Sequence, residues 1–316
     1  MHQSINFRAM GSEMLAIVDK PNGDPESALE QVPAWFEEWE QCLSRFRPDS
    51  ELSRLNGLNN QPVAVSETLW DVVDLSRFAE VLSGGLITPT VHDALLDAGY
   101  DRDIDELRLW GPRSSPASNA RAVDPLSAVL FDEGARTICL PEGVRLDLGG
   151  VAKGWSAHQA MLRLAQSGPA LVDAAGDIAL SGPQLHGKPW IIGVADPMHP
   201  GEDLLRLLIA AGGIATSGKD RRRWKQGGRW KHHLINPLSG EPADTDLLTV
   251  TVLAETVMEA EIAAKTIFLL GTEDGMEWAE ERPELAALLI RDRGEIVLSD
   301  RMHAYVQQGE EECQPW

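Results

Sequence analysis

Residues 146–154 of the 316-residue chain read LDLGGVAKG, and the hydrophobic spacing changes in the middle of this stretch. Before the two glycines every second residue is apolar, as in a β-strand: Val144, Leu146 and Leu148. After them the apolar residues recur at helical spacing, from Val151 to Leu164. The pattern predicts a strand that turns through two glycines into a helix.

The chemistry of this turn suits an anionic ligand. Glycine lets the backbone approach a ligand closely, and a helix start presents unpaired N–H groups and the positive end of the helix dipole. Asp147 and Lys153 add an acceptor and a donor charge, with Lys153 expected about one turn into the helix. Spacing alone therefore predicts a nucleotide or phosphate site. A glycine turn that only packs a helix on a sheet fits the same spacing.

Composition and charge exclude several classes of function. A hydrophobic content of 43% and a charged content of 24% are typical of soluble globular proteins. The net charge of -21 argues against nucleic acid or an anionic membrane as the main partner, because both require clustered positive charge. No run of about eighteen apolar residues occurs, so we expect no membrane insertion.

Cysteine usage and the N-terminus predict the compartment. Cys42, Cys139 and Cys313 lie far apart, without metal-ligand spacing or an even-numbered framework. The first residues, MHQSINFR, contain no apolar signal region and no lipid-accepting cysteine. The chain as given therefore predicts a cytoplasmic protein.

Strands and helices are mixed along the chain without strict βαβ alternation, which favours an α+β fold with mixed or antiparallel sheets and flanking helices. We expect a strand over residues 5–19 that is interrupted at 10–12, and a helix over 256–270 that Gly271 ends. Two further segments lack such patterns: residues 111–125 predict a mobile surface loop, and residues 307–316 a disordered acidic tail.

Eight segments, in order, resemble the ApbE family, the flavin transferases that move FMN from FAD onto a protein threonine. They are residues 10–12, 45–56, 85–91, 147–154, 173–177, 215–218, 233–240 and 250–271. One glycine turn is weak evidence, whereas eight ordered segments that span most of the chain are strong evidence.

The resemblance implies a single domain over residues 1–306, with FAD in a cleft between two intertwined lobes and Mg²⁺ at the FAD pyrophosphate. It also implies an acceptor flavoprotein. It assigns the metal to the Gly150 carbonyl and Glu261, and places His233 near the phosphates as a catalytic residue. The implied FAD contacts are Met10, Phe46, Asn56, Leu86, Ile87, Thr88, Asp147, Lys153, Thr216 and His233.

Several of these residues also fit simpler structural roles. Asp147 fits a cap of the turn, Lys153 an exposed helix lysine, and Phe46 a core aromatic. His232 is expected to be a solvated neighbour of His233. The basic run at residues 221–223 fits either a solvated loop or a contact with phosphate or a partner.

The strongest departure from the family lies at the metal. In Mg²⁺-dependent members the helix after the last strand carries an aspartate and, four residues later, a threonine, both ligands; here Glu261 and Lys265 stand at those positions. Lysine offers three donors and no lone pair. An ammonium about 4 Å from a divalent cation costs roughly 8 kcal/mol at an effective dielectric near 20, of which Glu261 offsets about half. Thr88 and Asn236 likewise stand where an aspartate is usual.

We therefore predict that Lys265, oriented by Glu261, takes over part of the metal's electrostatic role and joins His233 as a catalytic candidate. A plain i, i+4 helix pair is the alternative. The function predicted first is FAD:protein FMN transfer onto a threonine or serine hydroxyl, with release of AMP. Two alternatives stay open: an FAD-binding protein with little or no transferase activity, and a pyrophosphatase that splits FAD into FMN and AMP.

Overall fold

The structure is a computed structural model that describes residues 2–19, 25–112 and 121–307. The predicted mobile loop at 111–125 and the predicted tail at 307–316 fall mostly outside these described residues.

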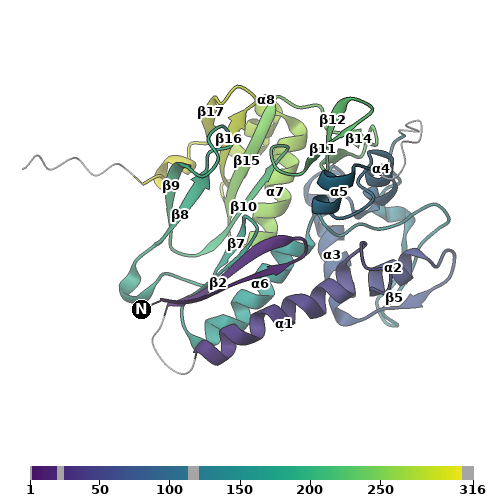
Figure 1. The fold of residues 1–316 in the computed structure, drawn as a ribbon, viewed down its shortest axis with the longest axis horizontal. Helices are drawn as coiled ribbons and strands as arrows, with labels where there is room; N and C mark the ends of the chain where they lie inside the picture. The colour runs from purple at the N-terminus through teal and green to yellow at the C-terminus, as the bar shows by residue number, and fades with distance from the viewer. Residues whose placement is uncertain (1, 20–24, 113–120, 308–316) are drawn as a thin grey trace, which may run out of the picture.

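One antiparallel sheet of eight strands forms the larger part of the molecule (Figure 1), in the order β1-β2-β6-β7-β10-β15-β16-β17. The strands are β1 His2–Ala9, β2 Ser12–Asp19, β6 Ala170–Ala174, β7 Asp177–Leu180, β10 Gly212–Gly218, β15 Leu247–Ala254, β16 Ala286–Arg291 and β17 Ile296–Leu298. Together with the flanking helices this sheet confirms the α+β prediction.

Both faces of the sheet are buried at its inner strands, which explains the nearly continuous apolar sequences of β6, β15 and β16. In β6, Val172 packs toward helices α1 Pro25–Leu43 and α6 Ala152–Leu164, whereas Leu171 faces the opposite side. There the hairpin of β8 Trp190–Ala195 and β9 Asp203–Ile209 covers it. Helix α7 Val257–Leu270 packs on β10 and β15 on the same side as α6.

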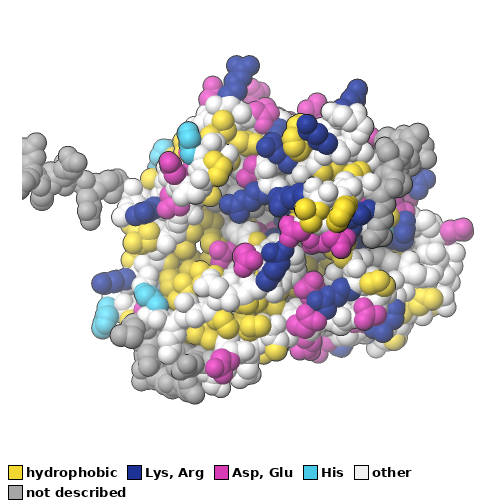
Figure 2. Space-filling model, viewed as in Figure 1, with side chains coloured by type: hydrophobic (Ala, Val, Ile, Leu, Met, Phe, Trp, Pro, Cys, Tyr) yellow, Lys and Arg dark blue, Asp and Glu magenta, His cyan; other side chains and the backbone are white. Residues whose placement is uncertain are grey.

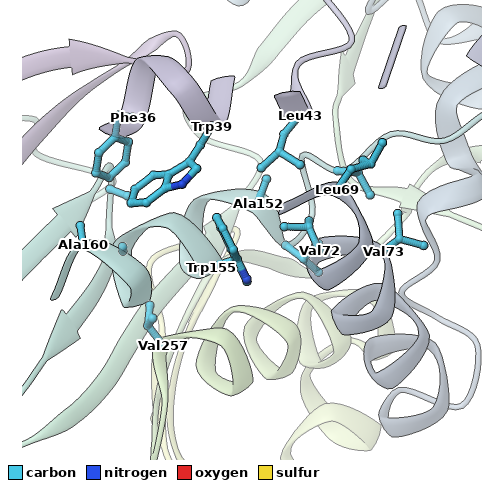
Figure 3. Close-up of a cluster of buried hydrophobic side chains, with 14 of the residues drawn as sticks. Phe36, Trp39, Leu43, Leu69, Val72, Val73, Ala152, Trp155, Ala160 and Val257 are labelled. Carbon is cyan, nitrogen blue, oxygen red and sulfur yellow. The ribbon is translucent and has the colours of Figure 1, made fainter. Parts of the chain in front are cut away.

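Aromatic packing fixes the start of α6 against α1 (Figure 3). Trp39 of α1 meets Trp155 of α6 edge to face, with ring centroids 5.5 Å apart. Leu69 and Val72, from helix α3 Glu67–Leu82, lie in the same cluster beside Ala152, the first residue of α6. The start of α6, directly after the glycine turn, is therefore packed against α1 and α3.

A second group of elements lies beside the sheet and carries the other wall of the site. Its helices are α2 Glu51–Asn56, α3, α4 His92–Asp97 and α5 Ile104–Trp110, with a small sheet of β3 Val63–Ala64, β4 Leu130–Asp132 and β5 Thr137–Cys139. Two short hairpins complete this side: β11 Arg223–Gln226 with β12 Arg229–His232, and β13 Ile235–Asn236 with β14 Glu241–Pro242. Helix α8 Thr272–Glu280 follows α7.

Two strand predictions need correction. The interruption expected at residues 10–12 is the two-residue turn of a hairpin: Met10 and Gly11 both have positive φ (49° and 68°), and Ser12 already belongs to β2, which pairs with β1. The predicted strand at 144–148 lies outside every sheet. Its alternating residues are buried as expected, but the backbone of Leu146 bonds to a side chain and Asp147 N–H donates to the Pro89 carbonyl at 2.7 Å.

Gly213 is a position where the close approach of β10 and α7 excludes any side chain. A Cβ there would lie 2.0 Å from the backbone nitrogen of Val257. We expect Gly213→Ala to lower the free energy of unfolding by about 1–3 kcal/mol, because the overlap forces the helix start away from the sheet. Urea unfolding measures this loss. Gly182→Ala, where a Cβ has no neighbour within 4 Å, is the matched control and should change stability by less than about 0.5 kcal/mol.

Candidate active site

A cavity of about 260 Å³ opens between the sheet and the second group of elements, and the glycine turn forms part of its wall. Residues from both halves of the chain meet there. Ten of the predicted site residues line it: Met10, Phe46, Leu86, Ile87, Thr88, Asp147, Gly150, Lys153, His233 and Lys265. Asn56, Thr216 and Glu261 are not among its lining residues.

Lys153 lies in the first turn of α6, because the helix begins at Ala152 rather than a turn earlier. Its ammonium contacts the Asp177 carboxylate and lies 3.6 Å from Oε1 of Glu261. The side chain is 13% exposed, so the interpretation as an exposed helix lysine is wrong. Burial lowers the pKa of Lys153 to about 7. A buried ammonium at a helix start is a strong donor for an anionic group.

Asp147 combines two functions at the turn. One carboxylate oxygen accepts the Gly149 N–H at 2.9 Å and caps the turn, and the other lies 2.5 Å from Nε of Arg45. The Arg45 guanidinium also lies over two aromatic rings, with its Cζ 4.1 Å from the Phe46 centroid and 4.8 Å from that of Tyr100. Asp147, Arg45 and the two rings thus form one connected wall of the cavity.

Glu261 and Lys265 form a buried ion pair on α7. Lys265 Nζ lies 2.9 Å from Oε1 of Glu261, and Oε2 accepts the Gly154 N–H at 3.0 Å. A side chain at residue 154 would displace this carboxylate, because a Cβ there would lie 2.5 Å from the same oxygen. Burial opposes the charge of Glu261, but the two ammoniums outweigh it and hold its pKa below the usual range. Burial lowers the pKa of Lys265.

His233 lines the cavity with its ring largely enclosed. Its Nδ1 is buried and has no hydrogen-bond partner among the described residues. Burial, followed by the positive charge of Arg222, lowers the pKa of His233 well below 6.5. The imidazole is therefore neutral at pH 7 and keeps a lone pair for a proton or a ligand donor.

His232 is buried in the structure, so the expectation of a solvated side chain is wrong. Its Nε2 lies 3.0 Å from the Ala243 carbonyl, and its Nδ1 accepts the Leu234 N–H at 3.3 Å. Both contacts fit the neutral ring. Burial lowers the pKa of His232 to about 4.

The depressed pKa of His232 makes stability depend on pH. Between pH 6.5 and 4 the imidazole of His232 binds a proton in the unfolded chain but not in the folded protein. The stabilisation that neutral His232 contributes is therefore complete above pH 6.5 and is lost as the pH falls to 4. The shift corresponds to about 3 kcal/mol. We expect His232→Gln to unfold with a shallower pH dependence over this window. Urea unfolding at several pH values measures the difference, and parallel curves for the two proteins would contradict the prediction.

Asn56 holds the backbone just before the glycine turn with two hydrogen bonds. Its Nδ2 donates to the Leu146 carbonyl and its Oδ1 accepts the Leu146 N–H, both at 2.8 Å. The side chain thus takes the place of a neighbouring strand. Thr216 also lies away from the cavity wall: it is exposed on β10, and its Oγ1 is 2.9 Å from Oγ1 of Thr251.

Removing the amide of Asn56 should loosen the turn. We expect Asn56→Ala to lower the free energy of unfolding by about 1–3 kcal/mol, because both backbone groups of Leu146 lose their partner. The exposed neighbour Asn59, changed to alanine, should leave stability within about 0.5 kcal/mol. Chemical denaturation of both variants tests this, and equal losses would contradict it.

Three charged residues of the site were not among the predicted ligands: Arg45, Asp177 and Arg222. Arg222 lines the cavity and donates to Oγ of Ser12 at 3.2 Å. Figure 2 shows Lys and Arg side chains gathered where β10, the β1–β2 hairpin and α5 meet. The only feature of the sequence that pointed to Arg222 was its position in the basic run at residues 221–223. Its neighbour Arg223 does not line the cavity, and its guanidinium lies over the Trp230 ring.

The residues around Glu261 do not fit a divalent cation. Lys265 stands where a third ligand would be needed and already occupies Oε1 of Glu261. Within residues 2–19, 25–112 and 121–307, no three His, Cys, Asp or Glu side chains come together in a way that could hold a metal ion.

Solved structures show the same fold. An ApbE protein from Thermotoga maritima superposes with a TM-score of 0.85 at 23% identity, covering 98% of this chain and 100% of its own. The flavinyl transferase ApbE of Pseudomonas stutzeri gives a TM-score of 0.80 at 22% identity, with 98% of each chain covered. The fold and the cavity thus define a protein of the ApbE structural class.

Similarity in sequence shows the family as well as the fold. The profile of the ApbE family matches residues 10–289. The FAD:protein FMN transferase of Treponema pallidum is 30% identical over 86% of this chain and 79% of its own length. That of Haemophilus influenzae is 29% identical over 87% of this chain and 82% of its own. The chain belongs to the ApbE family.

Across the described residues, no helix is long and apolar enough to cross a membrane.

Proposed function

We propose that this protein is an FAD:protein FMN transferase, which moves FMN from FAD to a threonine or serine hydroxyl of a flavoprotein and releases AMP. The proposal is supported by a cavity in a chain of the ApbE family that combines a neutral, half-buried His233 with the ammoniums of Lys153 and Lys265. The similar proteins of T. pallidum and H. influenzae are FAD:protein FMN transferases.

The residues supply the two requirements of phosphoryl transfer. The acceptor hydroxyl attacks the phosphorus on the FMN side, the bond from that phosphorus to the bridging oxygen breaks, and AMP leaves with that oxygen. His233 accepts the hydroxyl proton through its free lone pair. Lys153 and Lys265 neutralise the phosphate oxygens on which charge develops.

The proposal is tested by incubating the purified protein with FAD and a purified flavoprotein subunit. Flavin fluorescence on the acceptor in a denaturing gel, together with an equal amount of released AMP, supports transfer. Free FMN and AMP without labelled acceptor would identify a pyrophosphatase instead. Bound but unchanged FAD would identify a binding protein, and both of these results would overturn the proposal. A heat-denatured sample controls for non-enzymatic labelling.

We place this activity in the cytoplasm. Cys42 and Cys139 both carry free thiols, which fits a reducing compartment. Cell fractionation with an antibody against the chain tests this placement, and recovery of the protein outside the cytoplasmic fraction would contradict it.

A further inference from the structure

The ammonium of Lys265 is a fixed feature of the cavity. Residues 261 and 265 share one face of α7, and Glu261 is completely buried, whereas the Lys265 side chain is 11% exposed and lines the cavity. An exposed i, i+4 pair would leave its lysine free to move into solvent. Here the 2.9 Å contact with Glu261 holds the positive charge at the cavity wall.

Both oxygens of Glu261 are already engaged. Oε1 faces the ammoniums of Lys265 and Lys153, and Oε2 accepts a backbone N–H from Gly154. Hard divalent cations require several oxygen ligands, and a charged lysine provides none. The neighbouring Thr266 offers no replacement ligand, since it is completely buried and is not among the residues that line the cavity.

The charges around this part of the cavity suit a dianion. Lys265 and Arg222 are positive, and a bound dianion would favour the protonated form of Lys153, whose pKa is about 7 in the free protein. Glu261 and Asp177 bring two negative charges. The diphosphate of a dinucleotide carries two negative charges and many acceptor oxygens. Buried cations form short, charge-assisted hydrogen bonds with such oxygens.

We infer that the ammonium of Lys265, held by Glu261, takes the place of a divalent cation, so that this protein binds the FAD diphosphate without metal. The inference rests on the proposed function in so far as FAD is the ligand. It concerns how FAD is bound and is independent of whether the FMN moiety is then transferred.

Calorimetric titration of FAD into the wild-type protein, in excess EDTA and in excess MgCl₂, is the first test. We expect the same Kd in both buffers and no stoichiometric heat when Mg²⁺ is titrated into the FAD-loaded protein. FAD binding that weakens in EDTA, or one tight Mg²⁺ site in the loaded protein, would overturn the inference.

Variants of Lys265 provide the second test. Lys265→Met should weaken FAD binding about 10- to 100-fold in both buffers, the range expected for a lost hydrogen bond to a charged group. Lys188→Met, at an exposed lysine, is the matched control and should bind FAD like the wild type. Circular dichroism verifies that each variant is folded.

A double variant tests directly whether the Lys265 ammonium replaces a divalent cation. Glu261→Asp with Lys265→Thr places the side chains of the metal-dependent ApbE members at both positions. We expect it to bind FAD weakly in EDTA and more tightly in MgCl₂. If it binds FAD in EDTA as tightly as the wild type, the ammonium contributes nothing and the inference fails.

The outcomes separate the inference from the proposed function. Metal-independent FAD binding without any labelled acceptor overturns the transferase proposal and leaves the ammonium site standing. Mg²⁺-dependent FAD binding with a labelled acceptor does the reverse.

Discussion

Replacing His233 with asparagine is expected to lower the rate of FMN transfer about 10²- to 10⁴-fold, the range typical of losing a general base. FAD binding should change little, because the ammoniums of Lys153 and Lys265 remain in place. Asparagine can still donate and accept hydrogen bonds, but it cannot take up the hydroxyl proton. Initial rates of acceptor labelling at saturating FAD, with calorimetric FAD binding beside them, measure the two effects separately.

The control for this variant is His303→Asn, which changes an exposed histidine and should leave the rate unchanged. A loss of FAD affinity as large as the loss of rate would contradict a role as base and assign His233 to binding.

The dependence of kcat/KM on pH tests the protonation state of His233. Burial and the charge of Arg222 lower the pKa of its ring well below 6.5, so the ring is already unprotonated at pH 6.5 in the free protein. Because kcat/KM reports the free enzyme, we expect no inflection from this residue between pH 6.5 and 8. An acid limb near pH 6.5 that disappears in His233→Asn would contradict this prediction.

Regular elements with long periodic patterns were the most predictable part of the fold. The helix expected over 256–270 is α7, which begins after Thr256 in a capping box with Glu259 and ends at Gly271. Its sequence carries both end signals locally, so no distant residue is needed to recognise it. The hairpin of β16 and β17 is equally local.

The stretch at 144–148 shows where local patterns mislead. Alternating burial was correct, yet hydrogen bonds to the Asn56 side chain and the Pro89 carbonyl replace a sheet partner. These partners lie far away in the sequence, and periodicity contains no information about them. His232 and His233 illustrate the same limit, because only the fold directs one ring to the Ala243 carbonyl and the other to the cavity.

Most ion-pair partners in the site could not be predicted from the sequence either. The sequence identified Asp147 and Lys153 as charges at a turn, but their partners Arg45 and Asp177 come from α1's C-terminal loop and from β7. Spacing predicted the Glu261–Lys265 contact, since residues four apart share a helix face. The complete burial of Glu261, and the addition of Lys153 to the same carboxylate, required the packing of α6 against α7.

Glu261→Gln is expected to lower the free energy of unfolding by about 3–5 kcal/mol at pH 6, because it removes the negative charge shared by two buried ammoniums. The substitution keeps the shape and the acceptor for the Gly154 N–H, so the loss reports charge rather than a cavity. Urea unfolding measures it, and Glu255→Gln, at an exposed glutamate, should stay within about 0.5 kcal/mol of the wild type.

A compensating substitution distinguishes charge from packing in the effect of Glu261→Gln. In Glu261→Gln the ammonium of Lys153 still contacts Asp177, whereas that of Lys265 loses the carboxylate it contacts. Adding Lys265→Met removes this ammonium, so the double variant should be more stable than Glu261→Gln alone. The destabilisation of the single variant should also shrink as the pH rises, since a buried lysine without its carboxylate gives up its proton more readily. Additive losses in the double variant, or a loss that does not change with pH, would show that Glu261 contributes through packing alone. In that case the carboxylate of Glu261 would not stabilise the folded protein through its ion pair with Lys265.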